Sequence, residues 1–221
     1  MALGKLSTLQ ERILLLLANM TPPWTLSGGG ALAGFHTVHR DTRDLDLFWQ
    51  QRSELGDIVV QVRERLEGAG LAVASLQART AFAQLDVANE VGEHVALDLV
   101  ADPVPLAEPP VSVSVGGVTF LVDSPHQILV NKLCAVLGRS EPRDVEDIRV
   151  LLETGGDLER ALGDCPLQDA GFSPLTLAWT LRSLPLERLA TALGWSRERI
   201  DTATSFKLTL LERLLQFARP G

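Results

Sequence analysis

Two short segments of this 221-residue chain place aspartates between apolar residues, in a pattern that suits metal chemistry. In "DLDLF", Asp44 and Asp46 alternate with leucines, so a β-strand would turn both carboxylates to one face and both leucines to the other. Asp98 occupies the same kind of position in "VALDLV". If the two strands are neighbours, we expect the three carboxylates to converge.

Three converging carboxylates require a counter-ion. Each like-charged pair at about 4 Å repels by roughly 4 kcal/mol when the effective dielectric constant is about 20. A divalent cation offsets that repulsion, and a ligand set made only of oxygen atoms suits Mg²⁺ or Mn²⁺, which proteins often share with substrate phosphates. We therefore predict a metal site at Asp44, Asp46 and Asp98.

A run of three glycines, Gly28 to Gly30, leads directly into an apolar segment with helical spacing. Such a turn leaves backbone N–H groups unobstructed at the positive end of a helix, where phosphate binds. A glycine run alone is a weak signal, and so is a single pair of aspartates, but their short separation together with Asp98 is a stronger one. A metal ion beside a phosphate cradle predicts phosphoryl-transfer chemistry.

Composition and charge limit the function classes. The formal net charge of −8 argues against a sequence-blind nucleic-acid binder, which would cluster Lys and Arg side chains. Residues 1–125 carry 15 acidic and 8 basic side chains, so the excess negative charge lies in the half that holds the predicted metal site. The apolar run "ILLLLA" is too short for a membrane span or a convincing signal peptide, so we expect a cytoplasmic protein with no membrane partner.

The order of hydrophobic patterns predicts an α+β fold, in which a mixed β-sheet flanked by helices is followed by a C-terminal helical bundle. Helical spacing covers residues 6–20 and 54–69, and another helix is expected to start at Ala31. From Ser124 onward a Ser cap, a proline and helical spacing replace the strand pattern, which predicts a catalytic domain over residues 1–123 and a helical domain over residues 124–221. Strands are predicted in "WTLS", "DLDLF", "LAVASL", "TAFAQLDVA", "HVALDLV" and "VSVSVGGVTFLV", the last with a hairpin at its two glycines.

The segment "LSGGGALAGFHTVHRDTRDLDLF" resembles polymerase-β-like nucleotidyltransferases, and among them the toxins of the AbiEii/AbiGii type. The resemblance rests on the glycines, a small apolar helix, and a block that here contains Arg40, Thr42, Asp44, Asp46 and Phe48. Downstream, "LDL" around Asp98 looks like the third carboxylate of the family. The segment "NKLCAVLGRSEPRDVEDIRVLL" resembles its helical block and supplies Lys132, Arg139, Arg143, Asp144 and Asp147.

This resemblance implies an enzyme that moves a nucleoside monophosphate from a nucleoside triphosphate to an acceptor hydroxyl and releases pyrophosphate. Asp44 and Asp46 would hold two Mg²⁺ ions, and Asp98 would share the metal that activates the attacking oxygen. Lys132 would contact the triphosphate, positioned by Asp144 or Asp147, which could equally position Arg139 or the nucleotide. Alternatively, Lys132 and Arg139 are simply solvated charges on one face of a helix.

The phosphate-binding set implied by the resemblance contains two open points. Arg40 could contact phosphate or could be a structural partner of Asp44 or Asp46. The family commonly has Ser or Thr where this chain has Gly30, and Ser27 before the glycines could replace that hydroxyl. We therefore expect Ser27, Gly28, Gly29, Gly30, Arg40, Lys132, Arg139, Asp144 and Asp147 to bind the nucleotide and its phosphates.

The acceptor is the least determined part of the predicted reaction. The 3′ end of tRNA is favoured by the resemblance over a protein or a small molecule, and a toxin of this type would have a cognate antitoxin protein as partner. The alternatives are an inactive or catalytically weak nucleotide-binding module and an aminoglycoside-like nucleotidyltransferase. An RNA end could be held by basic residues of the helical half, unless they pair with nearby acids, as Arg197 could with Asp201: Lys132, Arg139, Arg143, Arg182, Arg188, Arg197, Arg199, Lys207, Arg213 and Arg219.

Several other residues are given structural roles. Cys134 and Cys165 lack metal-ligand spacing and are expected to be buried free thiols. His36 is expected to lie on a polar surface. Trp179 and Trp195 stand at helical spacing among leucines and are predicted to be core residues.

Overall fold

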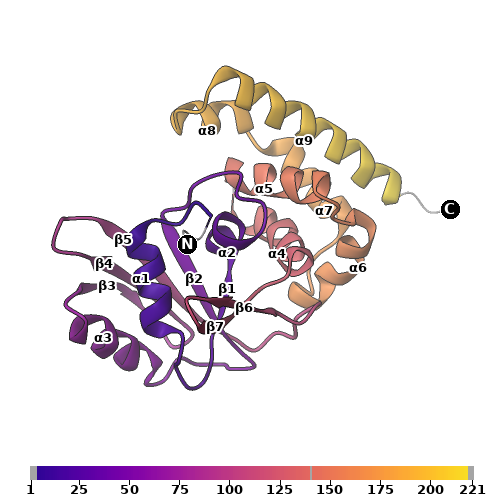
Figure 1. Cartoon of the computed structure of the whole chain (residues 1–221). Coiled ribbons are helices and arrows are strands. Elements are labelled where there is room, and N and C mark those ends of the chain that lie inside the picture. Colours follow the sequence, from indigo (N-terminus) through magenta and orange to yellow (C-terminus); the bar gives the residue numbers. More distant parts are fainter. Residues whose placement is uncertain (1–3, 140, 219–221) are drawn as a thin grey trace. The chain divides into compact units, whose positions relative to one another are not determined.

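The N-terminal half of the protein is organised around one mixed β-sheet (Figure 1). The computed structural model describes residues 4–139 and 141–218, and within these ranges the sheet has seven strands in the order β3-β4-β5-β2-β1-β7-β6. β2 runs parallel to β5 and β1 parallel to β7, whereas the other neighbours are antiparallel. The strands are β1 Thr25–Ser27, β2 Asp44–Gln50, β3 Ala72–Ala78, β4 Phe82–Ala88, β5 His94–Asp102, β6 Val111–Val115 and β7 Val118–Val122.

The strands follow from period-two alternation in the sequence. In β2, Leu45, Leu47 and Trp49 are fully buried, while the residues between them are half-buried. β4 and β5 repeat this pattern, so one face of the central sheet is apolar core and the other carries the polar side chains. The predicted strands and the hairpin at Gly116 and Gly117 are confirmed; both glycines have positive φ, as a tight two-residue hairpin requires.

Over residues 4–124, three helices accompany the sheet: α1 Thr8–Leu17, α2 Gly28–Phe35 and α3 Ile58–Gly68. α1 and α3 pack against each other over the β3 to β5 side, and α2 packs against β1 and β2 (Figure 1). α1 begins at a capping box in which Ser7 and Gln10 satisfy each other's backbone N–H groups. α2 starts at Gly28, three residues before the predicted start at Ala31, so the glycines form its first turn.

The chain divides into two compact units, Met1–Ser124 and Pro125–Gly221. Among its described residues, all the regular elements of the second unit are helices. These helices are α4 Pro125–Gly138, α5 Pro142–Glu153, α6 Leu158–Gln168, α7 Pro174–Ser183, α8 Leu186–Ala192 and α9 Arg197–Phe217. α4 contacts α5, α6 and α7, α9 contacts α5, α7 and α8, and α5 also contacts α8.

Two tryptophans of the helical unit differ from the prediction that both belong to the core. Trp179 is 72% exposed, because the buried face of α7 is formed by Leu177, Ala178 and Leu181 instead. The ring of Trp195 is half-buried, and the Arg199 guanidinium lies 3.8 Å above its centroid. No helix within residues 4–139 and 141–218 has the length and apolar character that a membrane crossing requires.

Candidate active site

The register of β2 and β5 brings two of the three predicted carboxylates to facing positions. Asp46 lies directly opposite Asp98, and Asp44 lies opposite Ala96. All three aspartates are on the half-exposed face, because the leucines on either side of them are fully buried on the reverse face. The structure therefore places Asp46 beside Asp98 on neighbouring strands. Asp44 lies on the same face two residues earlier, at the start of β2.

The Asp44 carboxylate has a protein donor of its own. The Thr42 hydroxyl donates to Asp44 Oδ1 across a short contact. Among the described residues, no group of three or more His, Cys, Asp or Glu side chains is placed to hold a metal ion. The facing pair of Asp46 and Asp98 nevertheless fits Mg²⁺, which commonly takes one or two carboxylates and completes its shell with water and substrate phosphate oxygens.

The glycine turn directly adjoins this pair. Ser27, the last residue of β1, pairs with Asp46, and α2 begins at the next residue. Gly28 has a φ of +58°, and a Cβ there would overlap Asp46 Oδ2. Glycine is thus required both by the backbone conformation and by the closeness of the Asp46 carboxylate.

The first turn of α2 presents backbone N–H groups without a side-chain cap, because Ser27, its N-cap residue, makes no capping hydrogen bond. Arg40 and Thr42 lie next to this turn. A Cβ on Gly29 would be 2.7 Å from Thr42 Oγ1 and 3.3 Å from Arg40 Nη2. The structure thereby brings the glycine turn together with the segment that precedes β2 and its Arg40 guanidinium. A helix N-terminus beside a guanidinium is an arrangement able to bind an anion.

Gly30 has a different environment from the other two glycines. It is buried, and a Cβ there would lie 3.1 Å from both Leu26 Cδ1 and Leu45 Cδ2. A Ser at this position would therefore crowd these two leucines, with the Asp44 backbone oxygen 3.8 Å from its Cβ. Ser27, which could replace that hydroxyl, is buried and hydrogen-bonds to the Asp123 carboxylate.

Asp123, a residue without an assigned role in the sequence, lies at the end of β7 beside Ser27. Burial raises the pKa of Asp123 to about 6, the Ser27 hydrogen bond opposes this shift, and the charge of Asp102 adds to it. His36 is also half-buried here rather than on a polar surface. Its Nε2 donates to the Asp123 backbone oxygen at 2.7 Å, and burial lowers the pKa of its ring despite that hydrogen bond.

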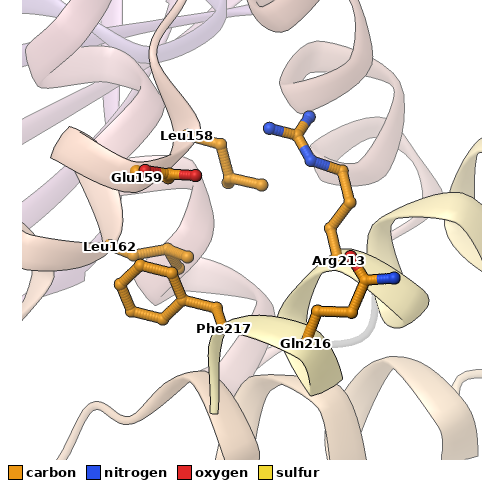
Figure 2. Close-up of a pocket in the computed structure, with 6 residues that line it drawn as sticks. All are labelled: Leu158, Glu159, Leu162, Arg213, Gln216 and Phe217. Atoms are coloured by element: carbon orange, nitrogen blue, oxygen red, sulfur yellow. The ribbon is translucent and has the colours of Figure 1, made fainter. Parts of the chain in front are cut away.

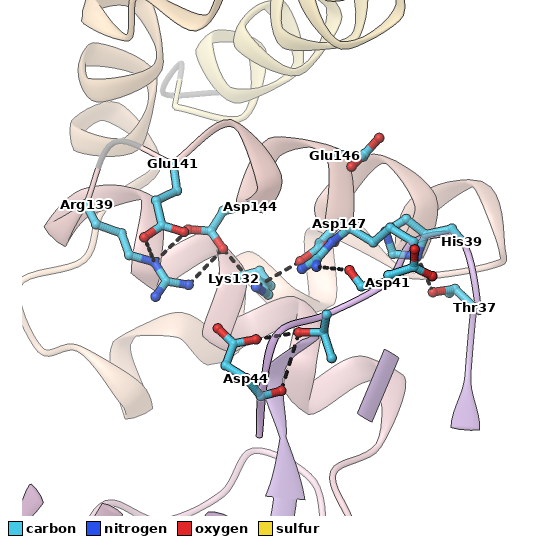
Figure 3. Close-up of polar contacts among 12 residues, drawn as sticks. Thr37, His39, Asp41, Asp44, Lys132, Arg139, Glu141, Asp144, Glu146 and Asp147 are labelled. Carbon is cyan, nitrogen blue, oxygen red and sulfur yellow. Dashed lines mark hydrogen bonds and ion pairs between the residues drawn. The ribbon is translucent and has the colours of Figure 1, made fainter. Parts of the chain in front are cut away.

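The four predicted site residues of the helical unit form one ion cluster. The Lys132 ammonium on α4 lies 2.8 Å from Asp144 Oδ1 and 2.9 Å from Asp147 Oδ2, both on α5 (Figure 3). Arg139 donates to the Asp144 carboxylate from Nε at 2.8 Å and from Nη2 at 2.9 Å. Lys132 is only 6% exposed, so its reading as a solvated charge is wrong.

The ion cluster keeps Lys132 and Asp144 charged although they are buried. Burial alone lowers the Lys132 pKa, but the charges of Asp147 and Asp144 outweigh it, so that pKa lies above its ordinary value. Burial likewise raises the Asp144 pKa, but the Arg139 hydrogen bond and the Lys132 charge outweigh it, and that pKa lies below its ordinary value. Buried charges of this kind are tolerated only when each has its partners.

Several of the basic residues that could have formed an RNA-binding wall are paired with neighbours. Arg197 pairs with Asp201 at 3.0 Å, as expected from their spacing, and with Glu187 at 2.7 Å. Arg199 binds Glu146, with its Nε 2.6 Å from Oε1. Lys207 donates to the Leu184 backbone oxygen at 2.9 Å. Arg219 lies outside the described residues.

A cavity of about 260 Å³ lies between α6 and α9 (Figure 2). Apart from Arg213, none of the residues to which the sequence assigned chemistry lines it. Two leucines and an aromatic ring form its apolar part, and Asp44, Asp46 and Asp98 are not among its lining residues. The lining residues are Leu158, Glu159, Leu162, Arg213, Gln216 and Phe217.

Comparison with known proteins agrees with the sequence resemblance. The family model described as "Nucleotidyl transferase AbiEii toxin, Type IV TA system" matches residues 12–204. JHP933 from Helicobacter pylori is similar in structure, with a TM-score of 0.55, 16% identity, and coverage of 95% of this chain and 92% of that chain. The nucleotidyltransferase toxin MenT4 from Mycobacterium tuberculosis is similar with a TM-score of 0.55, 18% identity, and coverage of 93% and 91%. These likenesses confirm the predicted fold. No curated protein sequence matches the chain.

The ion cluster predicts a large loss of stability when its cation is removed. Lys132→Met leaves Asp144 and Asp147 buried without the ammonium, and we expect a loss of about 3–5 kcal/mol in the free energy of unfolding. Arg149→Met, which breaks a more exposed α5 pair with Glu153, should cost less than about 1 kcal/mol. Urea unfolding followed by circular dichroism measures both; equal losses would show that the cluster is no more important than a surface pair.

The raised Asp123 pKa predicts a pH-dependent change in stability. The fold favours the protonated carboxyl, so its contribution is complete below the unfolded pKa of about 4 and is lost as pH rises through about 6. Asp123→Asn should therefore match the wild type near pH 4 and exceed it by about 1–3 kcal/mol near pH 7.5. Urea unfolding at both pH values measures this, with the exposed Glu90→Gln as control; a variant less stable than the wild type at the higher pH would contradict it.

Proposed function

Because the chain belongs to the AbiEii nucleotidyl transferase toxin family of type IV toxin–antitoxin systems, we propose that it transfers a nucleoside monophosphate from a nucleoside triphosphate to an acceptor hydroxyl, with pyrophosphate leaving. One observation carries this proposal: the facing pair of Asp46 and Asp98 lies beside the uncapped first turn of α2. Carboxylates that hold a divalent cation and amides that hold a phosphate are the two requirements of this chemistry.

Asp46 and Asp98 are the proposed first ligands of the metal, with Asp44 completing the set when the nucleotide binds. The donors are all carboxylate oxygens, which favours Mg²⁺ or Mn²⁺ over softer ions. When bound, the cation would neutralise charge on the phosphates and lower the pKa of the attacking hydroxyl. Asp98, opposite Asp46, is the proposed orienter of that hydroxyl, and it could accept its proton.

The phosphates are proposed to bind at the first turn of α2, with Arg40 as their cationic partner. The position of the Arg40 guanidinium beside Gly29 supports this role. Lys132 has three ammonium donors, and Asp144 and Asp147 take two of them. The proposed triphosphate contact of Lys132 uses the third, while Arg139, half of whose side chain is exposed, is proposed to bind the nucleotide.

Gly30 does not favour the alternative of an inactive nucleotide-binding module. In this chain, a side chain at position 30 would pack mainly against Leu26 and Leu45, which supports a packing role for Gly30. Gly28 and Gly29, by contrast, both adjoin polar side chains of the proposed site. These contacts support an active enzyme.

The acceptor is proposed to be RNA, with the 3′ end of tRNA as the first candidate, and a cognate antitoxin is the proposed protein partner. The family description supports the toxin–antitoxin context. Pairing of Arg197 and Arg199 with acids leaves less basic surface than the sequence suggested, so we expect a small footprint at the RNA end rather than a long groove. An aminoglycoside-like small-molecule acceptor is the alternative.

The metal role predicts two linked effects of Asp46→Asn. Millimolar Mn²⁺ should raise the melting temperature of the wild type, since a ligand bound only by the folded state stabilises it, and the variant should lose that rise. The variant should also transfer label from a nucleoside triphosphate at least about 100-fold more slowly, because its ligand charge is lost. Thermal melts and labelling measure the two effects; an equal metal response in both proteins would refute the site.

The glycine turn predicts different results at neighbouring positions. Gly29→Val would push Thr42 and Arg40 away from the turn, so nucleoside triphosphate binding should weaken by about tenfold or more. Gly30→Ser should leave nucleotide affinity close to that of the wild type and instead lower stability by about 1–3 kcal/mol, because its Cβ would crowd Leu26 and Leu45 in the core. Calorimetry and urea unfolding measure these quantities; higher nucleotide affinity in Gly30→Ser would contradict the assigned environment.

The acceptor class can be decided by labelling. Incubation with each labelled nucleoside triphosphate, total tRNA, cell protein and an aminoglycoside should label the RNA fraction, and Asp98→Ala should abolish that labelling. RNA labelling should also weaken steeply as salt rises, because phosphate contacts release counter-ions. Labelled protein at a yield unchanged in high salt, or a labelled aminoglycoside, would replace RNA as the acceptor.

A further inference from the structure

Gln84 on β4 is a polar residue of the candidate site that has no counterpart in the family motif described above. It occupies a half-buried position in "FAQLDVA", with buried Ala83 and Leu85 on either side. Register places it directly opposite Asp98, on the side of β5 away from β2. Its Nε2 donates to Asp98 Oδ1 at 2.8 Å.

We infer that Gln84 is a positioning residue that holds the Asp98 carboxylate in the orientation used to bind the divalent metal. This inference rests on the proposed function, because it needs Asp98 to be a metal ligand. A carboxylate can rotate about two side-chain bonds, and a hydrogen bond to one oxygen restricts both rotations. Groups that orient metal ligands in this way raise the affinity of a site although they do not touch the metal.

The charges around Asp98 explain why such a donor is needed. On the β2 side Asp98 faces Asp46, and the two carboxylates repel each other before a cation binds. On the β4 side, Asp86 stands two residues from Gln84 and is paired with His94 at 2.9 Å. Gln84 therefore supplies a neutral hydrogen-bond donor on the side opposite to Asp46, which holds Asp98 in place without adding a charge that would compete with the metal.

The neighbouring strand provides a matched control. Gln77 on β3 pairs with Gln84 across the sheet, so it is the next residue in the same row. With its amide oxygen facing Arg79, Gln77 accepts hydrogen bonds from Nη2 and Nε, both at 2.9 Å. Gln77→Met thus removes an equivalent amide without touching Asp98, while Gln84→Met keeps the length of the side chain and removes its donor to Asp98.

The test is Mn²⁺ binding to the full chain, measured from the electron paramagnetic resonance signal of free Mn²⁺ with no nucleotide present. Gln84→Met should raise the dissociation constant by about tenfold, the usual effect of losing a group that orients a ligand. Gln77→Met should bind Mn²⁺ as the wild type does. Both substitutions keep the net charge, so a general electrostatic effect cannot produce the difference.

Each result supports or overturns the inference. Equal Mn²⁺ affinity in Gln84→Met and the wild type would overturn it and leave the proposed function intact, whereas a wild type that does not bind Mn²⁺ would overturn the metal site and the inference together. Equal weakening by Gln77→Met would make the effect a general property of the sheet and would also overturn it. If Gln84→Met melts well below the wild type without metal, Gln84→Asn, which keeps the amide but shortens its reach, replaces it with the same expected loss.

Discussion

The parallel pairing of β2 and β5 is the constraint on which the proposed site depends. Leu45 and Leu47 are fully buried on one face of the sheet, so Asp46 must emerge on the other. A slip of one residue would expose the leucines and bury the aspartates, which makes the register costly to change. The burial of the apolar face thereby holds Asp46 opposite Asp98 although the two carboxylates repel each other.

The same constraint positions the phosphate-binding turn. Ser27 pairs with Asp46 at the end of β1, so the turn into α2 must begin beside that carboxylate. The three glycines then serve three different purposes. Gly28 adopts a positive φ beside Asp46, Gly29 leaves room for Thr42 and Arg40, and Gly30 packs against the core. Only the first two adjoin the polar site.

The helical unit accommodates its buried charges in a different way. Lys132 is enclosed by Asp144 and Asp147, and Arg139 covers the outer side of Asp144. Mutual neutralisation makes this cluster part of the fold of α4 and α5, whatever further contact Lys132 makes with a nucleotide. Loss of activity on replacing Lys132 is therefore interpretable only alongside a measurement of stability.

Local patterns were sufficient for the α+β fold, the strands and the family, because alternation, caps and the spacing of Arg40, Asp44 and Asp46 are properties of adjacent residues. Asp44, Asp46 and Asp98 could be proposed as ligands for the same reason. Their partners could not be predicted: nothing near Gln84 in the chain indicates that it binds Asp98, and nothing near Asp123 indicates that it binds Ser27. The sequence also did not reveal that Trp179 is exposed, or which of the three glycines lies against polar side chains and which against the core. Those features depend on which strands become neighbours and which helix faces are covered, and packing between distant segments decides both.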